Sequence, residues 1–123
     1  RLMRWVRAVN VARSCTLGER VGVADRWWLR LRGLSGKPSL PAGEGLLLSP
    51  CRAVHMMGMK FPLDIVFLDA VNRVVATYER LAPGRRTRWH RDARSALELP
   101  AGTLAATGTL AGDLIEYHEE NSR

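Results

Sequence analysis

The stretch Leu63–Tyr78, LDIVFLDAVNRVVATY, decides the fold class of this chain. Its first six residues form a strongly apolar run that only Asp64 interrupts, and residues 71–73, VNR, form a turn before a second apolar run. Short runs rich in Val, Ile and Phe on both sides of a turn are typical of a β-hairpin. We therefore predict strands over Leu63–Leu68 and Val74–Tyr78 that pair through a tight turn.

Outward from this hairpin, the sequence predicts more short strands and little helix. Alternating or apolar runs predict further strands at Arg1–Val11, Leu46–Leu48, Ser95–Leu99 and Leu114–His118. Asp25 before an apolar run and Gly33 after it predict a helix over Asp25–Leu31, and Gly102–Gly108 can form one helical turn. Polar, Gly-rich or Pro-rich stretches predict loops at Ser14–Gly22, Ser35–Gly45 and Leu81–Arg94. About six short strands and one short helix predict a mainly β (α+β) fold with a small barrel-like or strongly curved antiparallel sheet.

The size and composition of the chain are those of one globular domain. The chain has 123 residues, of which 46% are hydrophobic and 25% are charged, so we predict a single domain over residues 1–123. No run approaches the roughly 20 apolar residues that a membrane-spanning helix needs, and no continuous apolar segment near the N-terminus indicates a signal peptide. We expect a cytoplasmic protein, with export as the alternative if a leader has been removed. Exposed sheet edges allow either a monomer or a homodimer.

The net charge of +7 comes almost entirely from arginine, and six arginines fall within residues 80–94. This usage reflects either a coding bias or an anion-binding surface, because guanidinium groups suit phosphate and carboxylate. An aromatic ring among cationic side chains is the pattern of single-strand nucleic-acid binding. The nucleic-acid candidates are Arg85, Arg86, Arg88 and Trp89. The alternative is a solvated, mobile loop.

The segment Cys51–Asp64, CRAVHMMGMKFPLD, concentrates the side chains that can carry chemistry. Thiolate, imidazole and thioether are the soft ligands that copper prefers, and an extended segment would place alternate residues on one face. The metal candidates are then Cys51, His55, Met57 and Met59. The alternatives are a pocket that binds no metal, and core packing, because methionine and free cysteine are common in cores.

Three carboxylates next to apolar strands are further candidates. Asp64 lies at the head of the first hairpin strand, where a buried carboxylate needs a hydrogen-bond donor, and we predict His55 or Arg52 as that donor. A His–Asp pair would serve as an acid–base couple or as a structural latch. We predict structural roles for Glu98, which lies between two leucines, and for Asp113, which lies in a Gly-Asp turn.

Several motifs follow one another in an order that resembles a known family. They are Gly33-Leu34, GEGLLL at 43–48, the block 54–69, RVV at 73–75, LELPAG at 97–102 and Gly112-Asp113. Together they resemble domain of unknown function 192, a bacterial and archaeal family of uncharacterised proteins, over nearly the whole chain. The resemblance implies a small β-rich domain, exported in some members, without an established activity, substrate or cofactor. Many members carry an aromatic-Met-Lys-Asn sequence before Pro-Leu-Asp, so Met59, Lys60 and Asp64 match the family best, and no metal role carries over to Cys51 or His55.

We interpret the chain as a ligand-binding or structural β module with an unidentified small ligand. No Gly-rich phosphate loop, metalloprotease motif or dinucleotide fingerprint occurs in the sequence, which favours a protein that is not an enzyme and has no cofactor. The ligand-pocket candidates are His55, Met57, Met59, Lys60, Asp64 and Glu98. Copper binding and nucleic-acid binding are the two alternative functions.

Overall fold

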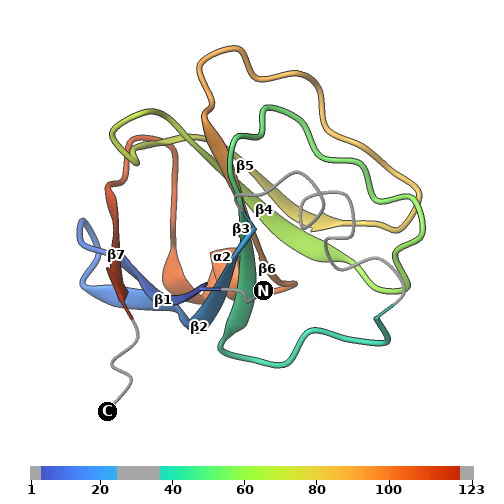
Figure 1. The fold of residues 1–123 in the computed structure, drawn as a ribbon, viewed down its shortest axis with the longest axis horizontal. Coiled ribbons are helices and arrows are strands. Elements are labelled where there is room, and N and C mark those ends of the chain that lie inside the picture. Colours follow the sequence, from blue (N-terminus) through green and yellow to red (C-terminus); the bar gives the residue numbers. More distant parts are fainter. Residues whose placement is uncertain (1–3, 25–36, 120–123) are drawn as a thin grey trace.

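The computed structural model describes residues 4–24 and 37–119, which form one curled sheet of seven strands and a short helix (Figure 1). The strands are β1 (Arg4–Asn10), β2 (Cys15–Ala24), β3 (Glu44–Leu48), β4 (Leu63–Leu68), β5 (Val74–Leu81), β6 (Ser95–Pro100) and β7 (Ile115–Glu119), and the helix is α2 (Thr103–Thr107). Their order across the sheet is β5-β4-β6-β3-β2-β1-β7. Every neighbouring pair is antiparallel except β2 and β3, which are parallel.

The sheet curls until its two edge strands approach each other at one end. Arg73, just before β5, forms an isolated antiparallel bridge with Leu114, just before β7. The Val74 N–H donates to the Asp113 carbonyl oxygen at 2.8 Å, which extends this contact. The fold is therefore a half-barrel closed at one end, as the sequence predicted.

Two apolar clusters lie on opposite faces of the sheet. The first cluster fills the curl and includes Val66, Leu97 and Leu104 of α2. The second cluster includes Ile65 and Phe67 on the other face, together with Met56 from the loop between β3 and β4. Because β4 and β6 contribute to both clusters, their sequences are almost continuously apolar, as expected for strands buried on both faces.

The predicted hairpin is confirmed, since β4 pairs with β5 in antiparallel register. The predicted loop at Ser14–Gly22 is wrong, because this segment belongs to the ten-residue strand β2. Its glycines suggested a turn, but Gly18 lies where a Cβ atom would come within 2.9 Å of the Val21 side chain. The predicted helix Asp25–Leu31 lies outside the described residues.

No helix within residues 4–24 and 37–119 is long and apolar enough to cross a membrane.

Candidate functional site

Two loops, residues 51–62 and 82–94, cover the second cluster and are hydrogen-bonded to each other along their length. In Figure 1 they lie on the side of the sheet away from β7. Val54 N–H donates to the Thr87 side-chain oxygen at 3.0 Å, and Thr87 N–H donates to the Val54 carbonyl oxygen at 2.9 Å. Further contacts are Met56 N–H to Arg85 O at 2.7 Å, Gly84 N–H to Met56 O at 2.9 Å and His90 N–H to Arg52 O at 2.8 Å. We call these paired segments, residues 52–56 and 84–90, the loop ladder.

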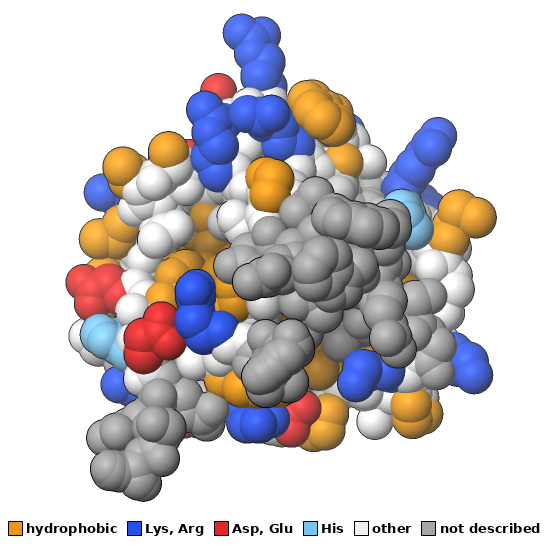
Figure 2. Space-filling model, viewed as in Figure 1, with side chains coloured by type: hydrophobic (Ala, Val, Ile, Leu, Met, Phe, Trp, Pro, Cys, Tyr) orange, Lys and Arg blue, Asp and Glu red, His pale blue; other side chains and the backbone are white. Residues whose placement is uncertain are grey.

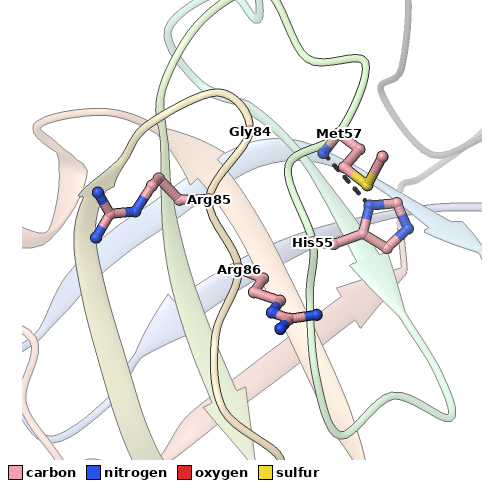
Figure 3. A pocket seen from close by; sticks show the side chains of 5 residues that line it. All are labelled: His55, Met57, Gly84, Arg85 and Arg86. Carbon is pink, nitrogen blue, oxygen red and sulfur yellow. Dashed lines mark hydrogen bonds between the residues drawn. The ribbon is translucent and has the colours of Figure 1, made fainter.

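An open hollow of about 540 Å³ lies on the outside of the loop ladder (Figure 3). Its lining residues are His55, Met57, Gly84, Arg85 and Arg86. His55 and Arg86 form a β-bridge, so their positions are fixed relative to each other. The Arg86 side chain extends toward the loop that carries His55, whereas Arg85 points to the opposite side of its own loop. Two regions that the sequence presents as separate candidates, the His/Met block and the arginine block, therefore share one site.

A local hydrogen bond orients the His55 ring. The Met57 N–H lies 3.3 Å from His55 Nδ1, which acts as the acceptor. A neutral imidazole that accepts at Nδ1 carries its proton on Nε2. His55 therefore offers an N–H donor, and together with the Arg86 guanidinium it makes the hollow a site rich in donors.

The cations of the two loops form no ion pair with any carboxylate in residues 4–24 and 37–119. They are Arg52, Lys60, Arg85, Arg86, Arg88, Arg91 and Arg94. Within the described part of the chain none of them forms an ion pair; the ion pairs there involve Arg4, Arg13 and His118 instead. Figure 2 shows Lys and Arg side chains projecting at the upper side of the molecule, where the loops lie in Figure 1. This side of the protein thus carries cations that form no ion pair with a carboxylate of the described residues.

Asp64, which the sequence makes a pocket candidate, forms its hydrogen bonds with residues that do not line the hollow. Its side chain is fully buried, and Oδ1 accepts from Arg80 N–H at 2.8 Å. Oδ2 accepts from Gly102 N–H at 3.1 Å and Leu104 N–H at 2.8 Å. The donors that we predicted, His55 and Arg52, are wrong, because three backbone N–H groups occupy the carboxylate. Asp64 joins β4 to the end of β5 and to the start of α2.

Glu98 is a buried carboxyl group of a different kind. It lies on β6 between Ile65 of β4 and Leu46 of β3, on the face of the second cluster. Its residue is 6% exposed, and no described residue donates a hydrogen bond or an ion pair to it. Burial raises its pKa from 4.5 to about 7. Glu98 does not line the hollow.

With the fold and the hollow described, the chain can be compared with known proteins. The family model DUF192, described as "Uncharacterized ACR, COG1430", matches residues 9–117. The chain belongs to the DUF192 family. No curated protein gives a significant match.

Two solved structures show that this DUF192 chain shares its fold with two bacterial proteins. A protein of unknown function from Novosphingobium aromaticivorans DSM 12444 is 22% identical with a TM-score of 0.79, over 93% of this chain and 84% of that chain. A protein from Sinorhizobium meliloti 1021, described as a proposed transcription regulator, is 22% identical with a TM-score of 0.78, over 94% of each chain. At this identity the likeness establishes the half-barrel and no more.

The predicted copper ligands of the DUF192 chain fall into two groups. Cys51 is half-buried, and its Sγ atom donates to the Ala53 carbonyl oxygen at 3.2 Å. Met59 packs against the second cluster, whereas His55 and Met57 line the hollow. The extended conformation assumed for this segment is interrupted, since Met59 N–H bonds back to Met56 O and residues 57–58 form a turn. No group of three or more His, Cys, Asp or Glu side chains able to hold a metal occurs in the described residues, and copper binding stays a prediction.

Sequence reasoning missed an aromatic cluster beneath the loop ladder. His90 is buried, its Nε2 atom lies 2.6 Å from the Tyr78 hydroxyl, and its ring centroid lies 4.5 Å from that of Phe67. Burial lowers the pKa of His90, and the positive charge of Arg88 lowers it further. In the sequence, His90 lies among arginines and suggests a surface loop. No local pattern marks it as buried, because its partners come from β4 and β5.

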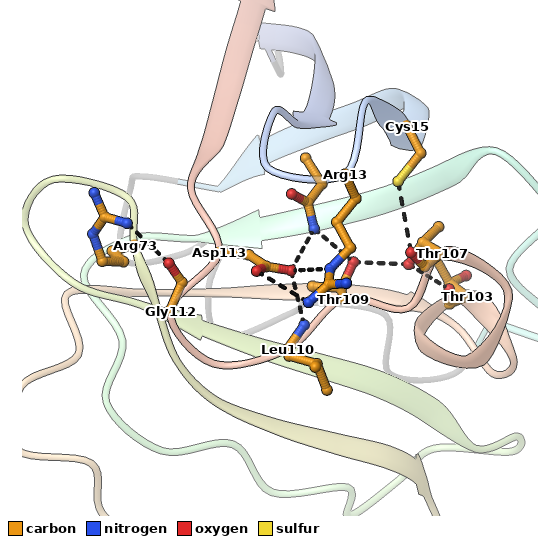
Figure 4. Close-up of polar contacts among 10 residues, drawn as sticks. Arg13, Cys15, Arg73, Thr103, Thr107, Thr109, Leu110, Gly112 and Asp113 are labelled. Carbon is orange, nitrogen blue, oxygen red and sulfur yellow. Dashed lines mark hydrogen bonds and ion pairs between the residues drawn. The ribbon is translucent and has the colours of Figure 1, made fainter.

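A polar network closes the end of the half-barrel (Figure 4). Asp113 accepts from Arg13 Nε at 2.8 Å, from Asn10 Nδ2 at 3.0 Å and from Leu110 N–H at 3.0 Å. The hydrogen bonds from Arg13 and Asn10 lower the pKa of Asp113 to about 2. The network ties β1 to the segment before β7, which accords with the structural role predicted for Asp113.

Proposed function

We propose that this DUF192 chain is a non-enzymatic module that binds a small anionic ligand in the hollow between its two loops. The observation that carries the proposal is the pairing of His55 and Arg86 across the loop ladder. A guanidinium beside an imidazole N–H suits a phosphate or carboxylate group, because such bonds are charge-assisted. The backbone bonds of the loop ladder hold both donors in place before any ligand arrives, which reduces the entropy lost on binding.

Binding is a better fit than catalysis because the groups that would do chemistry are engaged elsewhere. An acid–base couple of His55 with Asp64 would need a free carboxylate oxygen, and both Asp64 oxygens accept backbone N–H groups. The Cys51 thiol donates to a nearby carbonyl oxygen and does not line the hollow. The lining therefore consists of donors, a thioether and a glycine, which can hold an anion and contain no nucleophile.

The description of one structural neighbour bears on the class of anion. The protein from Sinorhizobium meliloti, which shares this fold, is described as a proposed transcription regulator. That description supports phosphate groups as the natural anion for this chain, and so do the arginines of residues 82–94, which form no ion pair with the described carboxylates.

The proposal is tested by titrating the protein with pyrophosphate and with citrate while following backbone amide NMR shifts. We expect saturable shifts at His55, Gly84 and Arg86. The Arg86→Gln variant should weaken binding at least about tenfold, since a hydrogen bond to a charged group contributes about 1.5–3 kcal/mol. The control is Arg7→Gln, which removes the same charge from an exposed position on β1 and should leave binding unchanged. Equal affinity for Arg86→Gln and the wild type, or no binding of either anion at millimolar concentration, would overturn the proposal.

A further inference from the structure

We infer that the loop ladder binds single-stranded nucleic acid, with Arg86 contacting a phosphate at the hollow and Trp89 stacking on a base. The inference rests on the proposed function, because the phosphate contact uses the anion site just described. It adds a second contact, an aromatic platform, that a small anion does not need. Stacking platforms beside positively charged grooves are the general means of holding single strands without sequence preference.

Trp89 is the first observation that carries this inference. Trp89 is 64% exposed, although burial of the large tryptophan ring normally stabilises a protein. No ring or cation–π contact to Trp89 occurs among the described residues, whereas Trp5 is covered by the Arg20 guanidinium at 3.8 Å. The ring face of Trp89 is therefore available for stacking on a planar group.

The backbone around Trp89 is held firmly enough to present that ring. His90 is buried and bonded to the Tyr78 hydroxyl, and its N–H donates to the Arg52 carbonyl oxygen at 2.8 Å. On the other side, Thr87 is buried and bonded to Val54 in both directions. Thr87 and His90 are both buried, and the two residues between them, Arg88 and Trp89, are exposed. A pre-positioned platform costs little conformational entropy when it binds.

The spacing between the anion site and the platform fits a short strand. Arg86 and Trp89 are three residues apart, so their Cα atoms are separated by no more than about 11 Å. Bases that stay stacked advance about 3.4 Å each along one strand, so three or four nucleotides reach from one residue to the other. The exposed side chain of Arg88 lies between Arg86 and Trp89 in the sequence and can contact an intervening phosphate, whereas the exposed Arg91 can contact a phosphate beyond Trp89.

A single strand fits this surface better than a duplex. Reading a duplex normally uses a helix or a two-stranded ribbon that enters the major groove. Within residues 4–24 and 37–119 the only helix is α2, which has five residues and buries Leu104 in the core. The loop ladder instead presents an exposed ring, and ring stacking requires bases that are not already stacked within a duplex.

The test measures binding of a fluorescein-labelled twelve-nucleotide oligothymidylate by anisotropy at about 50 mM salt and at a series of higher concentrations. We expect binding that weakens as salt increases. Trp89→Ala should weaken it about tenfold or more, because stacking of one base accounts for an effect of that size. Trp89→Phe, the matched control, should retain most of the affinity, and Arg7→Gln should retain all of it. All substituted side chains are exposed, and unchanged melting curves would verify folding.

The outcomes separate this inference from the proposed function. Pyrophosphate binding without oligonucleotide binding would overturn the inference and leave the anion site standing, whereas failure of both ligands would overturn both. Equal oligonucleotide affinity for Trp89→Ala and the wild type would overturn the stacking contact. Tighter binding of a duplex of the same length would overturn the single-strand assignment. Tighter binding of heparin that Trp89→Ala leaves unchanged would overturn it too. Support requires that Trp89→Ala weakens oligonucleotide binding while the affinity for pyrophosphate stays the same.

Discussion

Replacing Asp64 with alanine is expected to destabilise the folded protein by about 4 kcal/mol. The substitution leaves three backbone N–H groups, those of Arg80, Gly102 and Leu104, without their acceptor. A buried donor left without a partner costs about 1–3 kcal/mol. The Leu104 bond is buried, and we assign it about 2 kcal/mol; the other two bonds are partly buried, and water can replace the carboxylate in part, so we assign each about 1 kcal/mol.

Asp69 provides a matched control at the opposite end of the same strand. Its Oδ1 atom accepts from Val71 N–H at 3.0 Å and from Arg73 N–H at 2.9 Å, in an exposed turn. Water can take over both bonds when Asp69→Ala removes the carboxylate, so this loss should stay below about 1 kcal/mol. Both substitutions remove an aspartate that accepts backbone N–H groups, and they differ mainly in burial.

Urea unfolding followed by circular dichroism measures the difference. With a slope of about 2 kcal/mol/M for a protein of this size, Asp64→Ala should lower the unfolding midpoint by about 2 M, and Asp69→Ala by less than about 0.5 M. Asp64→Asn keeps one oxygen acceptor and should fall between the two. If Asp64→Ala costs no more than Asp69→Ala, then the carboxylate does not hold β5 and α2 to β4, and Asp64 should be reconsidered as a ligand-binding group.

Two further predictions concern the sheet. For Glu98, the folded-state pKa of about 7 lies above the ordinary value of 4.5, so the folded state binds the proton more tightly than the unfolded chain does. The resulting stabilisation is present below about pH 4.5 and is lost as the pH rises to about 7. Relative to Glu98→Gln, the wild type should lose about 3 kcal/mol between pH 4.5 and 8 in urea unfolding, and parallel pH profiles would contradict this. Gly45→Ala should cost about 1–3 kcal/mol by thermal or urea unfolding, because the new Cβ atom would lie 2.9 Å from the Glu98 carbonyl oxygen and 2.9 Å from the Leu99 side chain, and an unchanged midpoint would show that β3 and β6 can move apart.

The elements predicted well from sequence are those whose signal is local. The run Leu63–Leu68 is apolar because β4 is buried on both faces, and the hairpin turn follows from the residues between the two runs. β2 was missed because Gly18 serves close packing within the strand, where a Cβ atom would come within 2.9 Å of the Val21 side chain. Close packing against a neighbouring side chain and the geometry of a turn both select glycine, and a single sequence does not distinguish the two causes.

The partners of buried polar groups could not be predicted, because they depend on contacts between distant segments. Asp64 was correctly recognised as a carboxylate that needs donors, yet its donors are backbone groups 16, 38 and 40 residues away. A backbone N–H belongs to nearly every residue, so no side-chain pattern in the sequence distinguishes these three. His90 illustrates the same limit, since its partner Tyr78 comes from a different element.

The candidate site depends on the same kind of distant contact. The block around His55 and the block around Arg86 are about thirty residues apart, and each had a plausible function of its own when considered in sequence alone. The loop ladder joins them through backbone hydrogen bonds, which any two extended segments can form and which leave no trace in residue type. Once they are joined, the soft side chains of the first block separate. Cys51 and Met59 contribute to packing or local bonds, and His55 and Met57 remain beside the arginines. An imidazole N–H, the Arg86 guanidinium and an exposed tryptophan three residues further along are the reason we propose a phosphate-bearing ligand rather than a soft metal, since these donors match oxygen anions.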